Sequence, residues 1–245
     1  MQTDKRPGRI PALDLARTLA LIGMVRFHFG FDLESFGVIA PGTMESGFWW
    51  VFARIVAGSF LFMAGISLWL AHGQGIRWRG FVKRLVMIMA AAALVTWATH
   101  AALGEQFVFF GILHSIALSS LIGLVFLRVP ALLTLLAAAA AAAAPDYLRS
   151  PAFDAPWFWW TGLSDRPFFA VDYVPTLPWL APVLAGIAFG RIDSHRGLWD
   201  RLRTHTPGPV LHALTWPGRH SLAVYLIHQP VLITILTAMA KTGLL

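Results

Sequence analysis

Long apolar segments dominate this chain and leave it only a small set of possible folds. The sequence is 57% apolar and only 13% charged, which is about half the charged share of an average soluble domain, and its mean hydropathy is +0.66. This composition indicates an integral membrane protein, in which only helices and closed barrels satisfy every backbone polar group. Runs such as LVMIMAAAALVTWA (85–98) lack the alternation of a barrel strand. We therefore predict an all-α integral membrane protein, a bundle of about seven transmembrane helices.

Hydropathy places the expected membrane helices along the chain. Most of them approach the roughly 20 residues that a bilayer requires. They are predicted at 11–31, 49–71, 82–103, 108–127, 130–144, 175–191 and 217–240. The fifth is short and rich in alanine, and whether it spans the membrane fully is left open. Together the helices are expected to form a single membrane domain over residues 1–245.

The basic residues between these segments indicate an orientation. One side of the predicted bundle collects Lys5, Arg6, Arg9, Arg77, Arg79, Arg128, Arg196, Arg201 and Arg203. The other side has little beyond Arg149, Arg166 and Lys241. Because cytoplasmic loops are enriched in Lys and Arg, the N-terminus is predicted to be cytoplasmic and the C-terminus to lie outside. The chain has no cysteine, which excludes disulfides and thiolate chemistry.

The first expected helix carries ionisable residues that lipid solvates poorly. A charged side chain at the bilayer centre costs about 2.5–3.5 kcal/mol on insertion scales, which makes it a candidate for function. At 100° per residue, Asp14, Arg17, His28 and Asp32 fall within about 60° of one another. Arg17 and His28 are about 16 Å apart along the axis and must serve different parts of a site. The alternative for Asp14 and Arg17 is a simple i, i+3 ion pair.

The last expected helix has a second polar face. In GRHSLAVYLIHQP (218–230), Ser221, Tyr225 and His228 share an arc of about 60°, and Gln229 lies beside them. Hydrogen bonds between helices account for the serine and the tyrosine. They account less well for His228, because an imidazole within the membrane needs two partners.

The predicted topology sorts the remaining polar residues into two groups. The outer half gathers His28, Asp32, His100, His114 and Asp172. The inner half gathers Arg17, Arg84, Arg191 and Arg219. An outer acid–base group above an inner cationic group suggests chemistry rather than a passive scaffold. The histidines show no HxxxH or HExxH spacing, so no metal site is expected.

Five motifs of this chain, taken in order, resemble a known family. That family is the heparan-alpha-glucosaminide N-acetyltransferase catalytic-domain family, in its compact bacterial form. The motifs are RIPALDLARTLALIGMVRFHFGFDL (9–33), RIVAGSFLFMAGISLWL (54–70), GILHSIAL (111–118), DYVPTLPWLAPVLAGIAFGR (172–191) and GRHSLAVYLIHQPV (218–231). The resemblance covers most of the chain and implies a multi-pass protein of a bacterial inner membrane.

Members of this family are transmembrane acyltransferases, and the resemblance implies the same activity here. They take an acyl group from cytoplasmic acyl-CoA and deliver it to an acceptor at the outer or lumenal face. Related enzymes have a D-x-x-R helix start, matched by Asp14 and Arg17, and an essential outer-side histidine, for which His28 is the positional match. In the lysosomal members that histidine lies farther along, in a loop, so whether their glucosamine acceptor carries over stays open.

From these observations we assign expected roles. His28 is expected to act as catalytic base or acyl carrier with Asp32 orienting it, and His114 and Asp172 complete the expected catalytic set. The expected donor site, for acetyl-CoA as co-substrate, consists of Asp14, Arg17, Arg219 and His228.

The expected partners and the rival functions complete the sequence-based hypothesis. The expected partners are acyl-CoA, a glycan or other small acceptor bearing an amine or hydroxyl, and the lipid bilayer, without nucleic acid. A homo-oligomer is left open. The alternatives are a small proton-coupled transporter and a non-catalytic membrane partner.

Overall fold

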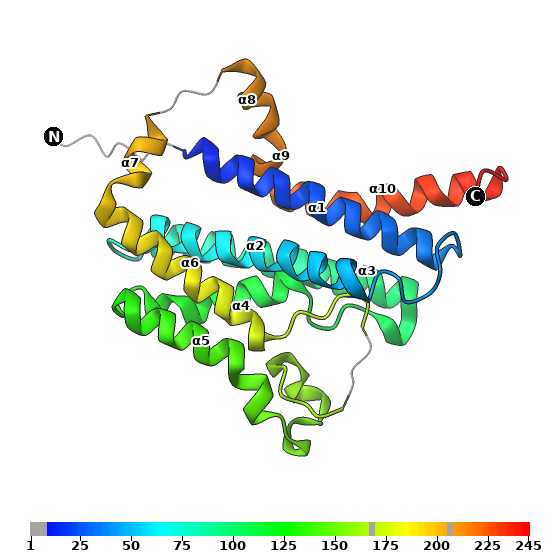
Figure 1. The fold of residues 1–245 in the computed structure, drawn as a ribbon, viewed down its shortest axis with the longest axis horizontal. Coiled ribbons are helices and arrows are strands. Elements are labelled where there is room, and N and C mark those ends of the chain that lie inside the picture. The colour runs from blue at the N-terminus through cyan, green and yellow to red at the C-terminus, as the bar shows by residue number, and fades with distance from the viewer. Residues whose placement is uncertain (1–8, 167–169, 205–207) are drawn as a thin grey trace. The chain divides into compact units, whose positions relative to one another are not determined.

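The computed structural model describes residues 9–166, 170–204 and 208–245, and within these ranges the chain is helical and contains no strand. Each predicted membrane segment contains one long helix (Figure 1). These helices are α1 (Pro11–Ser35), α2 (Gly47–His72), α3 (Trp78–Leu103), α4 (Ile112–Phe126), α5 (Ala131–Leu148), α6 (Thr176–Arg196) and α10 (Ser221–Lys241). Two of the basic residues used to predict orientation, Lys5 and Arg6, lie outside the described residues.

Short helices, which hydropathy does not reveal, lie in three of the connections between the long helices. The shortest α-helices are α7 (Leu198–Arg203), α8 (Pro209–Leu214) and α9 (Trp216–Arg219). The 3₁₀ turns are η1 (Gly104–Gln106), η2 (Pro151–Phe153) and η3 (Pro156–Thr161). Helices of four to six residues carry too few turns for a hydrophobic period to be visible in the sequence.

Four helical stretches among the described residues are long and apolar enough to cross a membrane. They are Gly47–His72, Trp78–Gln106, Ala131–Leu148 and Ser221–Lys241. The third of these is the alanine-rich helix whose span the sequence left open. Helix α4 is apolar but has only 15 residues, and α1 carries charged residues along its whole length. The all-helical membrane class is therefore confirmed, and the full set of seven spans stays a prediction.

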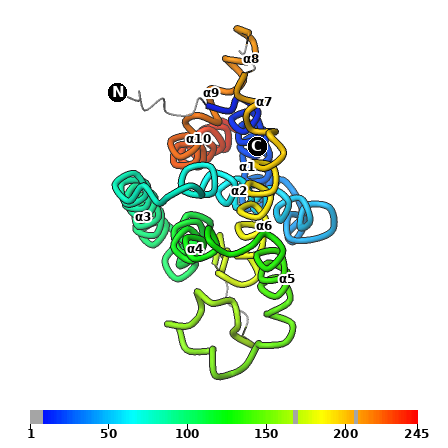
Figure 2. Tube along the Cα trace, turned by 90° about the vertical axis from the view of Figure 1, so that its left-hand side faces the viewer, coloured from blue at the N-terminus to red at the C-terminus, as the bar shows by residue number. Residues whose placement is uncertain are grey.

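Contacts divide the chain into two compact units, Met1–Val56 with Asp193–Leu245 and Ala57–Ile192. In the first unit, α1 packs along α9 and α10, which lie beside it in both views (Figures 1 and 2). The contact with α9 is very close at Gly218, where an added Cβ would lie 1.8 Å from the backbone oxygen of Asp14. The Gly218 N–H also donates to Thr18 Oγ1 at 3.0 Å. Only glycine permits this approach.

The loop that joins α1 to α2 is held by one carboxylate. Glu34, near the end of α1, accepts hydrogen bonds from the backbone N–H of Gly42 at 2.6 Å and of Met44 at 2.8 Å. Met44 is almost fully buried against Gly30 of α1. The loop therefore folds back onto the helix that precedes it, with the Glu34 carboxylate committed to its backbone.

In the second unit, α2 and α6 pack backbone to backbone. A Cβ at Gly65 would lie 2.0 Å from the Val183 oxygen, and one at Gly186 would lie 2.1 Å from the Phe62 oxygen. Small residues allow membrane helices to approach this closely, so that dispersion forces hold them together where no hydrophobic effect acts. The buried side chains Leu61 and Ile187 flank the contact.

Arg191, one of the arginines of the predicted inner group, connects three elements of the second unit. Arg191 of α6 donates a hydrogen bond to the backbone oxygen of Val129, between α4 and α5. Its guanidinium also lies 5.0 Å from the ring centroid of Trp69. Both contacts fasten α6 to its neighbours.

Replacing Gly65 by alanine is expected to destabilise the protein. The new methyl group has only backbone to displace, and overpacking of this kind costs about 1–3 kcal/mol. Thermal unfolding in detergent should show a lower midpoint for Gly65→Ala. Gly58→Ala, on the same helix with open space around the added Cβ, is the matched control. Equal midpoints for the two variants would contradict the close contact.

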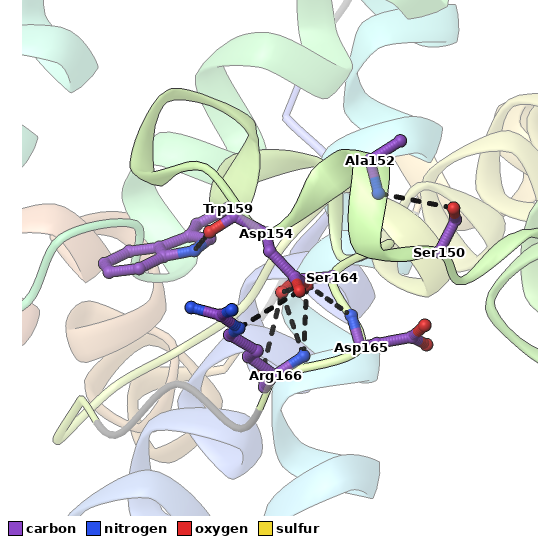
Figure 3. Close-up of polar contacts among 7 residues, drawn as sticks. All are labelled: Ser150, Ala152, Asp154, Trp159, Ser164, Asp165 and Arg166. Carbon is purple, nitrogen blue, oxygen red and sulfur yellow. Dashed lines mark hydrogen bonds and ion pairs between the residues drawn. The ribbon is translucent and has the colours of Figure 1, made fainter.

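A polar turn organises the segment between α5 and α6 (Figure 3). Asp154 Oδ1 accepts from Ser164 Oγ at 2.8 Å and from the backbone N–H groups of Asp165 at 3.0 Å and Arg166 at 3.3 Å. Its Oδ2 lies 3.2 Å from Arg166 Nε. The hydrogen bond from Ser164, assisted by the backbone donors and by Arg166, holds the pKa of Asp154 below its usual value.

An aromatic pair ties the same turn to the chain that enters α6. Trp159 Nε1 donates to the Asp154 backbone oxygen at 3.0 Å, and the Tyr173 hydroxyl donates to the backbone oxygen of Trp159. Burial raises the pKa of Tyr173 to about 12, so this hydroxyl keeps its proton at physiological pH.

The turn is expected to loosen in acid. Because the pKa of Asp154 is lowered on folding, its contribution is present above the unfolded pKa of about 3.9 and is lost as the pH falls through the folded value. Hydrogen-exchange protection of the Asp165 and Arg166 amides should therefore fall below about pH 4, and Asp154→Asn should lower it at neutral pH. Asp165→Asn, whose side chain points away from the turn in Figure 3, should leave protection unchanged. Equal protection in both variants would contradict this role of Asp154.

Candidate functional site

Two histidines meet where α1 and α10 lie side by side in the first unit. The ring centroids of His28, on α1, and His228, on α10, are 5.0 Å apart. His228, which the sequence analysis placed in the donor site, therefore lies beside the expected catalytic histidine instead. The Nδ1 atom of His228 faces the backbone oxygen of Tyr225, one turn earlier. A carbonyl oxygen only accepts, so Nδ1 carries the proton, and in the neutral ring Nε2 is left with a lone pair.

One turn further along α1, Asp32 is buried and bonded to α10. Gln229 Nε2 donates to Asp32 Oδ1 at 2.7 Å. The sequence analysis predicted that Asp32 orients the His28 ring. Neither a hydrogen bond nor an ion pair joins these two described residues, and Asp32 is bonded to Gln229 instead. The i, i+4 spacing places the two side chains on one face, but the carboxylate is held by the neighbouring helix instead.

Three atoms in this cluster have no partner among the described residues. They are Asp32 Oδ2, His228 Nε2 and Gln229 Oε1, and all three are buried. Since the Gln229 amide nitrogen and the His228 Nδ1–H are already used, each remaining atom is a hydrogen-bond acceptor. A buried acceptor without a donor costs about 1–3 kcal/mol. We call this cluster the His28–Asp32 site, and each of its three free atoms can accept a hydrogen bond from an N–H or O–H group.

Near the start of α1, a second polar group has mostly internal partners. Arg17 Nη1 lies 2.7 Å from Asp14 Oδ1, which is the simple i, i+3 ion pair that the sequence offered as an alternative. The Arg17 side chain is 24% exposed. Arg219, at the end of α9, contacts His212 Nε2 and donates to the His212 oxygen, both at 3.0 Å. A guanidinium has five N–H groups, and Arg219 Nε is buried without a hydrogen-bond partner among the described residues.

His114 and Asp172, predicted as catalytic, lie together in the second unit at the start of α4. The Gly111 N–H donates to His114 Nδ1 at 3.3 Å, so Nε2 carries the proton and faces Thr96 Oγ1 at 3.3 Å. Asp172 Oδ2 accepts from the Ile112 N–H at 3.3 Å. Both side chains thus satisfy N–H groups that a helix start leaves unpaired. Their catalytic role stays a prediction.

Two residues of these networks were not assigned to the site from the sequence. Gln229 stands beside the polar face of its helix, and its partner lies 197 positions away, so only the fold reveals the bond. Thr96 lies inside an apolar run and bonds both Val108 O and His114. No group of three or more His, Cys, Asp or Glu side chains in the described ranges could hold a metal ion.

The chain matches the family described as Heparan-alpha-glucosaminide N-acetyltransferase, catalytic, over residues 9–230. It therefore belongs to this family, and the resemblance noted from its motifs is confirmed. Family membership and the apolar helices together indicate a membrane acetyltransferase. No curated protein and no solved structure matches the chain.

Substituting His114 separates capping from catalysis. His114→Ala leaves the Gly111 N–H unpaired, which is expected to lower the free energy of unfolding by about 1 kcal/mol, as for a lost helix cap. If capping is the whole role of His114, the rate of acetyl transfer by the folded fraction stays near that of the wild type. His100→Ala, an exposed imidazole outside this network, is the control. Loss of transfer with an unchanged unfolding midpoint would establish the catalytic role instead.

Proposed function

We propose that the protein is a membrane-embedded acyltransferase that moves an acetyl group from cytoplasmic acetyl-CoA to an acceptor at the outer face, and that this acceptor is an amine. The observation that carries the proposal is the set of three free acceptor atoms beside His28. An amine brings several N–H donors on one nitrogen, whereas a hydroxyl brings one. A glycan amine, such as that of an amino sugar, fits this requirement.

The proposed chemistry uses His28 as the base or as the acyl carrier. As a base, its ring takes the proton that the amine loses when nitrogen attacks the thioester carbonyl carbon. The new C–N bond replaces the C–S bond, and CoA leaves as the thiol. As a carrier, a ring nitrogen of His28 first displaces the CoA thiolate from the acetyl carbon. The amine then displaces the imidazole, and the proton that it loses ends on the thiolate. In either case Asp32, His228 and Gln229 hold the amine with their free acceptor atoms.

The proposed donor site lies at the other end of α1. Arg17 and Arg219 bring the guanidinium groups that suit CoA phosphates, and Asp14 holds Arg17 in place. His28 lies about 16 Å farther along the helix. This distance is of the length that the extended pantetheine arm covers, so that the phosphates and the thioester occupy different ends of one helix.

The proposal includes a membrane orientation. Seven spans, with a cytoplasmic N-terminus in a bacterial inner membrane, bring the start of α1 to the side of acyl-CoA. The excess of Lys and Arg on that side supports this orientation. His28 and Asp32 then lie toward the outer face, where the acceptor arrives.

Release of free thiol from acetyl-CoA by the purified protein tests the function. With amino sugars as acceptors, the wild type should release thiol, and the corresponding sugars with a hydroxyl in place of the amine should be much poorer acceptors. His28→Ala should abolish transfer yet still bind acetyl-CoA, because the phosphates are held at the other end of α1. His100→Ala is again the matched control. Transfer by His28→Ala at the wild-type rate would refute the assignment.

The same assay distinguishes binding of the amine from chemistry. Asp32→Asn keeps the bond from Gln229 through its oxygen but loses the charge, and a charge-assisted hydrogen bond is worth about 1.5–3 kcal/mol. We therefore expect the KM for the amine to rise about 10- to 100-fold, with a smaller change in kcat. An unchanged KM would remove Asp32 from the acceptor site.

A further inference from the structure

A separate pair of arginines lies at the junction of α1 and α2, in the first unit. The Arg26 guanidinium lies 5.5 Å from the ring centroid of Trp49, and the Arg54 guanidinium lies 3.4 Å from that of Trp50. Arg54 also donates to the Trp50 backbone oxygen at 3.4 Å. Both arginines are exposed. We call these four residues the Arg–Trp cluster.

The cluster brings both guanidiniums to one end of the two helices. Arg26 lies nine residues before the end of α1, about 14 Å along the axis, and Arg54 lies seven residues after the start of α2, about 10 Å. Their guanidiniums nevertheless meet neighbouring tryptophans in the first turn of α2. Long basic side chains near helix ends extend in this way toward the membrane surface. We therefore expect the two charges to reach the headgroups of the membrane face that carries the α1–α2 loop.

No carboxylate among the described residues forms an ion pair with either arginine. The nearby acids of α1 are engaged elsewhere, since Glu34 holds the Gly42 and Met44 N–H groups and Asp32 is bonded to Gln229. Glu45, in the loop, is exposed and pairs with neither. The cluster thus carries two positive charges that the fold leaves uncompensated.

The cluster is also distinct from the His28–Asp32 site. At 100° per residue, Arg26 and His28 point in directions about 160° apart around α1, which puts them on nearly opposite sides of the helix. The apolar side chains next to it on α2 face outward, with Phe48 67% and Ile55 64% exposed. On a membrane protein such side chains contact acyl chains.

We propose that the Arg–Trp cluster binds the phosphate of an anionic phospholipid at this face of the membrane. Guanidinium groups bind phosphate through paired N–H donors, and each arginine keeps N–H groups that are not used within the protein. The tryptophan rings hold the guanidiniums by cation–π attraction and lie at the level where headgroups begin. The exposed apolar side chains of α2 pack against the acyl chains of the same lipid.

Native mass spectrometry of the full chain, titrated with phosphatidylglycerol in detergent, tests the proposal. The wild type should retain phosphatidylglycerol more strongly than phosphatidylcholine, whose quaternary ammonium is repelled by the arginines. The double variant Arg26→Gln with Arg54→Gln should bind phosphatidylglycerol about tenfold more weakly, as expected for at least one lost charge-assisted contact. The double variant Arg149→Gln with Lys241→Gln, which removes two exposed positive charges elsewhere, should bind like the wild type.

Three results would overturn the proposal. Equal retention of the two lipids by the wild type would do so without any variant, so the test does not depend on how the variants fold. An equal loss of binding in both double variants would show that net charge alone attracts the lipid. Displacement of phosphatidylglycerol by inorganic phosphate at equal concentration would assign the site to a soluble anion.

Discussion

The first helix carries ionisable side chains that a bilayer cannot solvate, and the first unit is built around covering them. Asp14 and Asp32 are both buried, one beside Gly218 of α9 and the other on Gln229 of α10. The Asp14 carboxylate pairs with Arg17 of the same helix, whereas that of Asp32 depends on α10, and an unpartnered carboxylate would cost several kcal/mol in hydrocarbon. Packing of α9 and α10 along α1 partners the polar groups of this predicted membrane helix, and it also brings the residues of the His28–Asp32 site together.

The long helices could be predicted because lipid leaves little choice, but several of their ends could not. The fourth segment was predicted to begin at 108, yet α4 begins at Ile112, where Asp172 and His114 satisfy its first N–H groups. Asp172 is sixty positions away, so hydropathy carries no sign of this cap. The short α7, α8 and α9 were missed for a different reason, since they are too short to show periodicity.

The helical wheel grouped Asp14, Arg17, His28 and Asp32 on one arc, and three of these residues, Asp14, His28 and Asp32, lie against α9 or α10. It could not say which partner each would take. Spacing alone favoured Asp32 with His28, whereas the tertiary fold gives Asp32 to Gln229. Two residues spaced i, i+4 share a face of the helix, but they need not bond to each other. Here a side chain of a neighbouring helix reaches the carboxylate, and the sequence does not reveal which helix that is.

The three unpaired acceptors in the His28–Asp32 site lower the stability of the folded protein, but they leave the site able to bind a hydrogen-bond donor. Each buried acceptor without a donor weakens the folded state by about 1–3 kcal/mol, and a network that is only partly satisfied is costlier in a low dielectric than in water. A ligand that supplies the missing donors returns that free energy as affinity, and stabilises the bound fold by mass action. An ionised Asp32 shares its negative charge between both carboxylate oxygens and so attracts a protonated amine, which must lose that proton before its nitrogen attacks. The same electrostatic reason separates an amine from a neutral hydroxyl at this position, before any chemistry takes place.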